Sequence, residues 1–433
     1  MSAAAAPSAL PKRAFAIIFG VSVATALGNT GLISVLPAIG RSLGIPDEMV
    51  VAIFSLSAVL WAVSSPFWAR ASDRYGRKPL MMVGLCGFMV SMTVCGVIVS
   101  AGLRQLATPM VIFGCLLCGR ALFGLFGAAS SPATQAYVAD QTPREQRTQA
   151  MSGLAGAIGL GTVVGPFLAP MFIYPVIGLA GPLFSFALIA AAMLIIVWRL
   201  LPDSGRAPAA EPEDAAPAGK PQPIWRDRRV IPFLIYGFVV ATCQTAQQQT
   251  LGFLIIDQLG VSPLAAQRPI AIAMMFGAVA ALLAQWGVIR MFEMTPRQLL
   301  RWGVLCAAAG NLMVALGHDY STVVAGYAVA SLGFGFARPG FTAGGSLAVG
   351  SKDQARVAGA IASVNGINAV LAPAFMALYR HAHAAPFILN MALMLGMLVY
   401  AFASPALRNA DPAPATRDDA TLATLERSDE GGG

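Results

Sequence analysis

Charged residues are scarce in this sequence. They make up 11% of its 433 residues, whereas a typical soluble protein carries about 25%. Hydrophobic residues supply 57% of the chain and occur in long runs. At a rise of ~1.5 Å per residue, a helix of roughly 20 residues crosses the ~30 Å hydrocarbon core of a bilayer. The shortage of charge excludes an ordinary soluble domain, and the runs predict an all-α polytopic membrane protein.

Residues that usually serve metal binding or catalysis are also few. The three histidines, His318, His381 and His383, lie in predicted loops, and all six cysteines lie inside predicted spans. No nucleophile, base and acid occur in a recognisable catalytic arrangement. We therefore expect that the protein is not an enzyme, and that it has neither a cofactor nor a metal site.

A nucleic-acid partner is not expected either, although the formal net charge is +8. The Lys and Arg residues lie between the apolar runs, and no basic helix interleaved with aromatic residues occurs. The expected partners are the lipid bilayer and a small-molecule solute, and we expect a monomer.

The apolar runs predict twelve membrane-spanning helices in two groups of six. An N-terminal bundle over residues 13–201 and a C-terminal bundle over 229–404 are joined by a Pro-, Ala- and charge-rich linker at 202–228. Residues 1–12 and 405–433 have the Ala/Ser/Pro-rich or polar composition of disordered ends. The predicted spans are residues 14–38, 48–69, 79–101, 108–138, 148–171, 178–200, 229–256, 266–290, 299–317, 321–349, 355–378 and 384–404.

Positive charge is distributed unevenly between the two sets of loops. Only four cations lie in the loops on the side opposite the termini: Arg41, Arg104, Arg268 and Arg380. Cytoplasmic loops are enriched in Lys and Arg, so we predict that both termini and the linker are cytoplasmic and that the protein lies in the inner (cytoplasmic) membrane of the cell. The first apolar run continues for about 24 residues, too long for a cleaved signal peptide, and we predict that it is retained.

The loop between the second and third predicted spans concentrates charge. It reads Asp73-Arg74-Tyr75-Gly76-Arg77-Lys78, in which Asp73 has cations to pair with and Gly76 suits a sharp turn with positive φ. A solvated basic loop would explain the charge alone. The spacing, however, resembles the signature loop of the major facilitator superfamily of secondary transporters, which usually has glycine where this chain has Ala69. The resemblance implies two pseudo-symmetric bundles and a gating role for the loop.

A weak internal repeat supports two related halves. The segments 141–147 and 351–356 each follow a Gly-rich span and precede a span with a late proline. Arg147 and Arg356 are 209 residues apart, and Pro166 and Pro373 are 207 residues apart. Parallel repeats of six helices relate the two halves of a major facilitator.

The fourth predicted span carries a deep cation. Arg120, Gly124, Gly127, Ser131 and Gln135 recur at steps of three and four residues and so share one helix face. Arg120 lies roughly 17 Å from the outer end of the span, where facing lipid would cost at least ~2.5 kcal/mol. It should therefore face the bundle interior, either in a structural hydrogen-bond network or at a cavity. Its surroundings resemble the fourth-helix motif of the superfamily, which implies a role in proton or substrate handling.

Two further resemblances concern gating and direction of transport. Asp140 ends the fourth span, where in the family an acid pairs with the loop arginine; this implies a gate formed by Asp140 and Arg77, whereas alone it would be an ordinary surface carboxylate. Gly161, Gly165 and Pro166 resemble the fifth-helix antiporter motif of drug exporters, although close helix packing alone would also explain the glycines.

Other polar residues recur on single faces of several predicted spans. They suggest a central cavity lined by spans one, four, seven, ten and eleven, although hydrogen bonds between helices would also use them. The candidate cavity residues, besides Arg120 and Gln135, are Asn29, Gln244, Gln248, Arg338 and Asn365. The abundant Phe, Met and Leu of these spans would suit an amphipathic, largely apolar solute.

No carboxylate lies in the middle of any predicted span. The nearest are Asp140 and Asp257, at the inner end of the fourth span and the outer end of the seventh. Asp257 is the candidate for proton coupling, because partial desolvation favours a neutral acid; a solvated acid at a helix end is the alternative. Coupling to protons is thus implied by the resemblance and not by a residue pattern.

The resemblance covers residues 13–404 and is closest to the twelve-helix drug:proton antiporter group. It implies export of a drug-like or metabolite-like solute by alternating access, with protons as the exchanged ion. An uptake carrier for a small metabolite is the first alternative, and a membrane sensor that transports nothing is the second.

Overall fold

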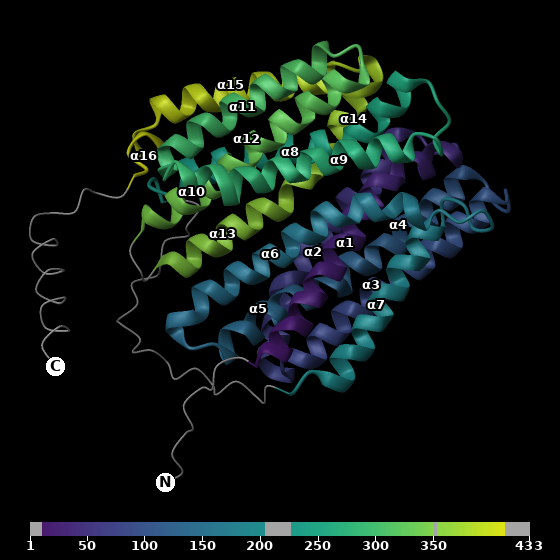
Figure 1. The fold of residues 1–433 in the computed structure, drawn as a ribbon, viewed down its shortest axis with the longest axis horizontal. Coiled ribbons are helices and arrows are strands. Elements are labelled where there is room, and N and C mark those ends of the chain that lie inside the picture. The colour runs from purple at the N-terminus through teal and green to yellow at the C-terminus, as the bar shows by residue number, and fades with distance from the viewer. Residues whose placement is uncertain (1–10, 204–226, 350–352, 412–433) are drawn as a thin grey trace, which may run out of the picture.

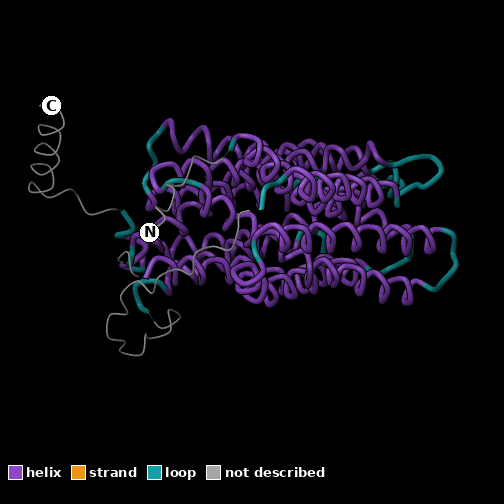
Figure 2. The backbone as a smooth tube through the Cα atoms, turned by 90° about the horizontal axis from the view of Figure 1, so that it is seen from below, coloured by secondary structure: helices purple, strands orange, loops and turns teal. Residues whose placement is uncertain are grey.

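The computed structural model of the chain describes residues 11–203, 227–349 and 353–411. Most of the two predicted disordered ends and of the predicted linker lie outside these residues. The described chain consists of helices and short loops, with a single isolated antiparallel bridge between Tyr174 and Gly178 and no strand within the described ranges. The fold is therefore all-α, and the helices run side by side along one common direction with the loops at both ends (Figure 2).

Six helical segments form the N-terminal bundle, coloured purple to teal in Figure 1. The fourth segment contains a 3-10 turn at Gly127–Ala129, and the fifth ends in another at Ala169–Phe172. The helices of this bundle are α1 (Lys12–Ser42), α2 (Asp47–Tyr75), α3 (Arg77–Leu103), α4 (Pro109–Phe126), α5 (Ser130–Gln141), α6 (Arg144–Leu168) and α7 (Gly181–Leu200).

The C-terminal bundle, coloured green to yellow in Figure 1, has six further segments. A π-helical turn at Leu283–Val288 separates α9 from α10, and a 3-10 turn at Asn368–Leu371 separates α13 from α14. The helices are α8 (Ile231–Leu259), α9 (Gln267–Leu282), α10 (Ile289–Met291), α11 (Pro296–Leu316), α12 (Tyr320–Leu347), α13 (Gln354–Ile367), α14 (Ala372–His381), α15 (Ala385–Ala403) and α16 (Pro405–Arg408).

Ten of these helical segments are long and apolar enough to cross a membrane, judged on the described residues. The predicted seventh span (α8) and eleventh span (α13 with α14) are helical but are not among the ten. Five glutamines lower the hydropathy of α8, and the 3-10 turn divides the eleventh span into two short helices. The membrane-protein class is confirmed, whereas twelve crossings remain a prediction.

Helix contacts repeat between the two bundles. In the N-terminal bundle α3 packs on α4 and α7, and α1 packs on α6; in the C-terminal bundle α11 packs on α12 and α15, and α8 packs on α13 and α14. Each C-terminal contact joins the segments six places later in the chain than its N-terminal counterpart. Contacts between the bundles show the same correspondence. The fifth segment (α6) contacts the eighth (α9), and the second (α2) contacts the eleventh (α13 and α14).

The buried apolar clusters show where the two bundles hold together. The largest cluster contains residues of both, including Ile39 of α1, Phe253 of α8 and Tyr379 of α14. Two other large clusters lie toward the ends of the helices that carry the linker, and each belongs to one bundle. The shared buried cluster therefore joins the bundles at the predicted outer half, whereas the clusters toward the predicted cytoplasmic half each belong to one bundle. Glycines of α6 still contact the C-terminal bundle, since a Cβ atom at Gly156 would lie 3.1 Å from Trp286.

Candidate functional site

A cavity between the two bundles has two adjoining compartments. The first has a volume of about 400 Å³ and is walled by α1, α2, the fourth segment, α6, α8 and the eleventh segment. The second, of about 410 Å³, is walled by α1, α6, α8, α9 and α12, with Asn368. Five residues line both compartments: Asn29, Ile33, Thr245, Gln248 and Asn368. The compartments are therefore two halves of one space between the bundles.

The structure places most of the predicted cavity residues on these walls. Asn29, Arg120, Gln135 and Gln248 line the first compartment, and Asn29, Gln244, Gln248 and Arg338 line the second. Asn365 lies in α13, but its side chain is outside the described part of the structure. The roles of these residues in transport remain predictions.

Arg120 of α4 is almost completely buried, with 2% of its surface exposed. Its guanidinium lies over two aromatic rings, 5.1 Å from the centroid of Phe54 and 4.7 Å from that of Phe123. Nη2 donates a hydrogen bond of 3.0 Å to the side-chain oxygen of Asn29. Nε and Nη1 have no hydrogen-bond partner among the described residues. Aromatic faces stabilise a cation. They do not, however, supply the oxygen acceptors that a carboxylate would offer to the Nε and Nη1 hydrogens.

Arg338 of α12 is exposed at the wall of the second compartment. No ion pair of its guanidinium occurs among the side chains that the structure describes. The residues that line the two compartments include no Asp or Glu. The cavity therefore holds two cations with no compensating carboxylate in its described walls.

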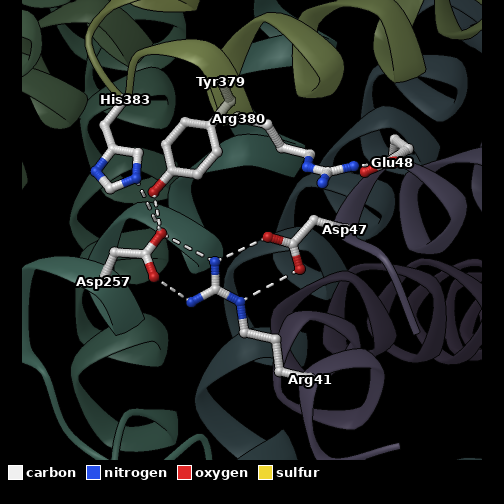
Figure 3. A network of polar contacts seen from close by, with 7 residues as sticks. All are labelled: Arg41, Asp47, Glu48, Asp257, Tyr379, Arg380 and His383. Atoms are coloured by element: carbon white, nitrogen blue, oxygen red, sulfur yellow. Dashed lines mark hydrogen bonds and ion pairs between the residues drawn. The ribbon is translucent and has the colours of Figure 1, made fainter. Parts of the chain in front are cut away.

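A network of charged side chains joins the bundles at the predicted outer end (Figure 3). Arg41, at the end of α1, forms ion pairs with Asp47 of α2 and Asp257 of α8. Its Nη2 lies 2.8 Å from Asp47 Oδ2 and 2.9 Å from Asp257 Oδ2. Glu48 of α2 pairs with Arg380 of α14 as a second bridge between the bundles.

Asp257 is the centre of this network on the C-terminal side. Tyr379 donates its hydroxyl to the same carboxylate, and His383 Nε2 lies 3.8 Å from Oδ2. Hydrogen bonds and an opposite charge favour the ionised form of an acid. The expectation that desolvation would favour neutral Asp257 is therefore wrong for this arrangement, in which Asp257 is a paired carboxylate.

The signature loop lies at the opposite end. Gly76 links α2 to α3 with φ +96°, the positive value expected for a sharp turn. Arg77 is 8% exposed; its Nε donates to Asp140 Oδ2 at 2.9 Å, and Nη1 contacts Asp73 and Ser72. The predicted contact between Arg77 and Asp140 is present. Both residues belong to the N-terminal bundle, however, so the pair alone does not join the bundles, and gating by it remains a prediction.

The two remaining cations of the loop differ in surroundings. Lys78 Nζ lies 3.6 Å from Asp203, which follows α7. The Arg74 guanidinium lies 5.4 Å from the ring centroid of its neighbour Tyr75. Contacts of this kind at an exposed surface contribute little to stability.

The glycines of the antiporter-like motif touch the first helix. A Cβ atom at Gly165 would lie 2.3 Å from the carbonyl oxygen of Leu27, and one at Gly161 would lie 2.6 Å from that of Val23. Thr30 of α1 donates a hydrogen bond of 3.3 Å to the Gly161 carbonyl. Pro166 follows within the last turn of α6, before the 3-10 turn. These residues therefore bring α1 and α6 into backbone contact beside the cavity.

Sequence reasoning missed the outer network apart from Asp257. A signal was available, because Arg41 and Arg380 are two of only four cations in the loops predicted to lie outside. Cations that depart from the positive-inside rule need a local reason. It also missed Phe54 and Phe123, which resemble ordinary core aromatics in the sequence.

Comparison with known proteins agrees with this architecture. A family model described as Major Facilitator Superfamily matches residues 18–373. Multidrug resistance protein 2 of Bacillus subtilis (strain 168) is 30% identical over 155 residues, which is 36% of each chain. A probable triacylglyceride transporter of Mycobacterium bovis (strain BCG / Pasteur 1173P2) is 24% identical over 339 residues, covering 71% of this chain and 64% of the relative. The matches thus span between about one third and two thirds of the length of these relatives.

A solved structure shares the fold over almost the whole chain. It is a bacterial homologue of the human lysosomal transporter Spinster, in an inward-facing and occupied conformation. The TM-score is 0.67 at 14% identity, and the match covers 93% of this chain and 98% of that chain.

Proposed function

The chain belongs to the Major Facilitator Superfamily, and on this premise we propose that it exports a drug-like or metabolite-like amphipathic solute by alternating access, in exchange for protons. In this family the two bundles move against each other around a site at their interface. We place the protein in the cytoplasmic membrane as a monomer, with both termini inside.

The observation that carries the proposal is the cavity between the bundles, with the ion pairs and the shared buried cluster that join the bundles at its predicted outer end. Ion pairs and shared apolar packing link the bundles at the predicted outer end. Toward the other end the buried clusters are confined to single bundles. An arrangement that is closed to the outside and loose toward the cytoplasm is one of the two states that alternating access requires.

Export is favoured over uptake by two observations. The α6 glycines that resemble the antiporter motif lie against α1 beside the cavity. One matching relative is named for multidrug resistance, and another for triacylglyceride transport. Apolar and aromatic residues such as Ile33, Phe54, Trp61 and Phe123 form much of the first compartment wall, which suits a solute with a large apolar part.

We further propose that protons act at the outer network, with Asp257 as the acid that titrates. Burial raises the pKa of Asp257, but the hydrogen bonds from Arg41 and Tyr379 outweigh it and hold the pKa below its ordinary value. The carboxylate would therefore bind a proton once the outer ends of the bundles have separated, and the bound proton would prevent its pairing with Arg41. The other ionisable groups facing Asp257 are Asp47, Tyr379 and His383. Among the described cavity walls no acid offers a competing site.

Everted membrane vesicles with an imposed pH gradient test the proposed function. An exporter should accumulate an amphipathic solute when the vesicle interior is acidic, and a protonophore should abolish the accumulation. Vesicles without the protein supply the baseline, and Asp319→Asn supplies a control that changes an exposed outer carboxylate outside the network. Accumulation that is independent of the gradient would refute the exchange with protons, and no accumulation of any solute would refute export.

Uptake of a small metabolite is the second candidate. The two cations in the cavity favour it, because a small charged metabolite needs such partners. The same vesicles decide between the two, since an uptake carrier would release a preloaded solute instead of accumulating it.

A further inference from the structure

The cations of the cavity point to the chemistry of the solute. Arg120 lies on one compartment and Arg338 on the other, and Asn29, Thr245 and Gln248 are among the polar residues between them. Both arginines come from corresponding segments of the two bundles, the fourth and the tenth. A solute that occupies the shared middle of the cavity would therefore be flanked by a cation from each bundle.

Arg120 is incompletely partnered for a group so deeply buried. Aromatic rings and one amide oxygen surround it, while Nε and Nη1 have no partner among the described residues. Buried cations in proteins are normally paired with an acid, because desolvating an unpaired charge is costly. An oxyanion in the first compartment would supply both the missing acceptor and the missing charge.

The charge balance of the cavity distinguishes between solute classes. A cationic solute would meet two like charges and no carboxylate, and the repulsion is strong where water is excluded. A neutral solute would leave both guanidinium groups unpaired. Only an anionic solute is attracted by both cations. Arginine is well suited to binding carboxylate, sulfonate or phosphate groups.

The remaining walls define the rest of the solute. Phe54, Trp61 and Phe123 border the first compartment, and Tyr327 and Phe334 border the second. We propose that the transported solute is an amphipathic organic anion, whose acidic group binds Arg120 with Arg338 as the second cation and whose apolar part packs on these rings. This deepens the proposed function and rests on it.

A matched series of probes tests the preference for anions. Naphthoate, naphthalenemethanol and naphthylmethylammonium share one apolar body and differ in charge. Binding is measured by titration calorimetry on the full chain in lipid nanodiscs, with empty nanodiscs as the blank. Naphthoate should bind at least about tenfold more tightly than the alcohol, as expected for a charge-assisted contact, and the ammonium compound should bind most weakly.

Variants assign the preference to the two arginines. Arg120→Gln should remove most of the advantage of naphthoate over the alcohol, Arg338→Gln should remove part of it, and Arg120→Lys should retain part because the charge remains. Arg104→Gln, which changes an exposed cation in the loop after α3, is the control and should bind like the parent chain. Retention of alcohol binding shows that each variant is folded.

The outcomes separate this inference from the proposed function. Equal binding of the three probes, tighter binding of the cation, or no binding of naphthoate overturns the anionic solute. An advantage for naphthoate that survives Arg120→Gln overturns the assignment to Arg120. If everted vesicles transport a cationic or neutral solute with the pH gradient, export stands and this inference fails. If naphthoate binds through Arg120 but neither it nor any other solute accumulates in everted vesicles, the inference about binding stands and the proposed export fails.

Discussion

Replacing Asp257 with asparagine should weaken the contact between the bundles at the outer network of Figure 3, which we call the outer gate. In the structure the Asp257 carboxylate accepts from Arg41 and Tyr379, and Arg41 belongs to the other bundle. Asparagine keeps the size of the side chain but removes its charge. The substitution therefore acts on the bridge between bundles and leaves the packing around it almost unchanged.

The size of the effect follows from partial burial. The side chains of Arg41 and Asp257 are 21% and 22% exposed, so their pairing lies between an exposed ion pair, worth about 0–1 kcal/mol, and a buried one, whose disruption costs about 3–5 kcal/mol. Arg41 keeps Asp47 as a partner, which prevents the larger loss. We expect a loss of about 2 kcal/mol, or a roughly 30-fold rise in the ratio of outer-open to outer-closed molecules.

Spin labels on the two bundles report this ratio. Leu106, in the loop after α3, and His318, in the loop before α12, are exposed at the outer end and lie outside the network. Pulsed electron resonance on such a doubly labelled chain should show a longer distance population growing in Asp257→Asn. Asp319→Asn is the matched control, because Asp319 is an exposed outer carboxylate whose described hydrogen bonds remain within the start of α12.

The effect of pH gives the same prediction an independent check. Pairing in the outer-closed state holds the pKa of Asp257 below its ordinary value of about 3.8. Lowering the pH through this value and below should therefore favour the outer-open state in the parent chain, and Asp257→Asn should lose this response. An identical distance distribution in the parent chain and in Asp257→Asn would refute the claim that Asp257 stabilises the outer-closed state.

Three other predictions concern the remaining motifs. Gly76→Ala should strain the turn before α3, because φ there is +96°, and should reduce both thermal stability and transport flux. Gly165→Ala should separate α1 from α6 and abolish flux, whereas Gly396→Ala, with open space around the added methyl group, should leave flux unchanged; equal effects would exclude close approach as the cause. Charge reversal at Asp140 should impair flux, and reversal of Arg77 in the same chain should partly restore it, which a double-mutant cycle measures.

Helix positions were predictable because the lengths of the apolar runs are a local property of the sequence. The breaks within segments were not. The 3-10 turn at Gly127–Ala129 and the π-helical turn at Leu283–Val288 lie inside continuous apolar runs, where neither periodicity nor hydropathy changes. Helix α8 shows the opposite: its glutamines lower the hydropathy, and four of them line the cavity, namely Gln244, Gln247, Gln248 and Gln249.

Contacts between distant helices were predictable only where a resemblance supplied them. The pair of Arg77 and Asp140 is an example, since the two residues lie 63 positions apart. Asn29 was predicted to line the cavity with Arg120, but their hydrogen bond across 91 positions was not predicted. Arg41 and Asp257 are 216 positions apart in different bundles. A single sequence contains no record of the rotation and depth of one helix relative to another, so such pairs need a structure.

The separation of charges in the structure limits how transport and proton exchange can be coupled. The acid proposed to titrate lies at the outer end, whereas the described cavity walls contain cations and no acid. Direct competition between a proton and the solute for one carboxylate is therefore not available at these walls. The proposed coupling would instead act through the position of the bundles, because α1 carries both Asn29, the partner of Arg120, and Arg41 of the outer network. Because both residues lie on α1, Asn29 near its middle and Arg41 in its last turn, we expect an opening at Arg41 to displace Asn29 as well.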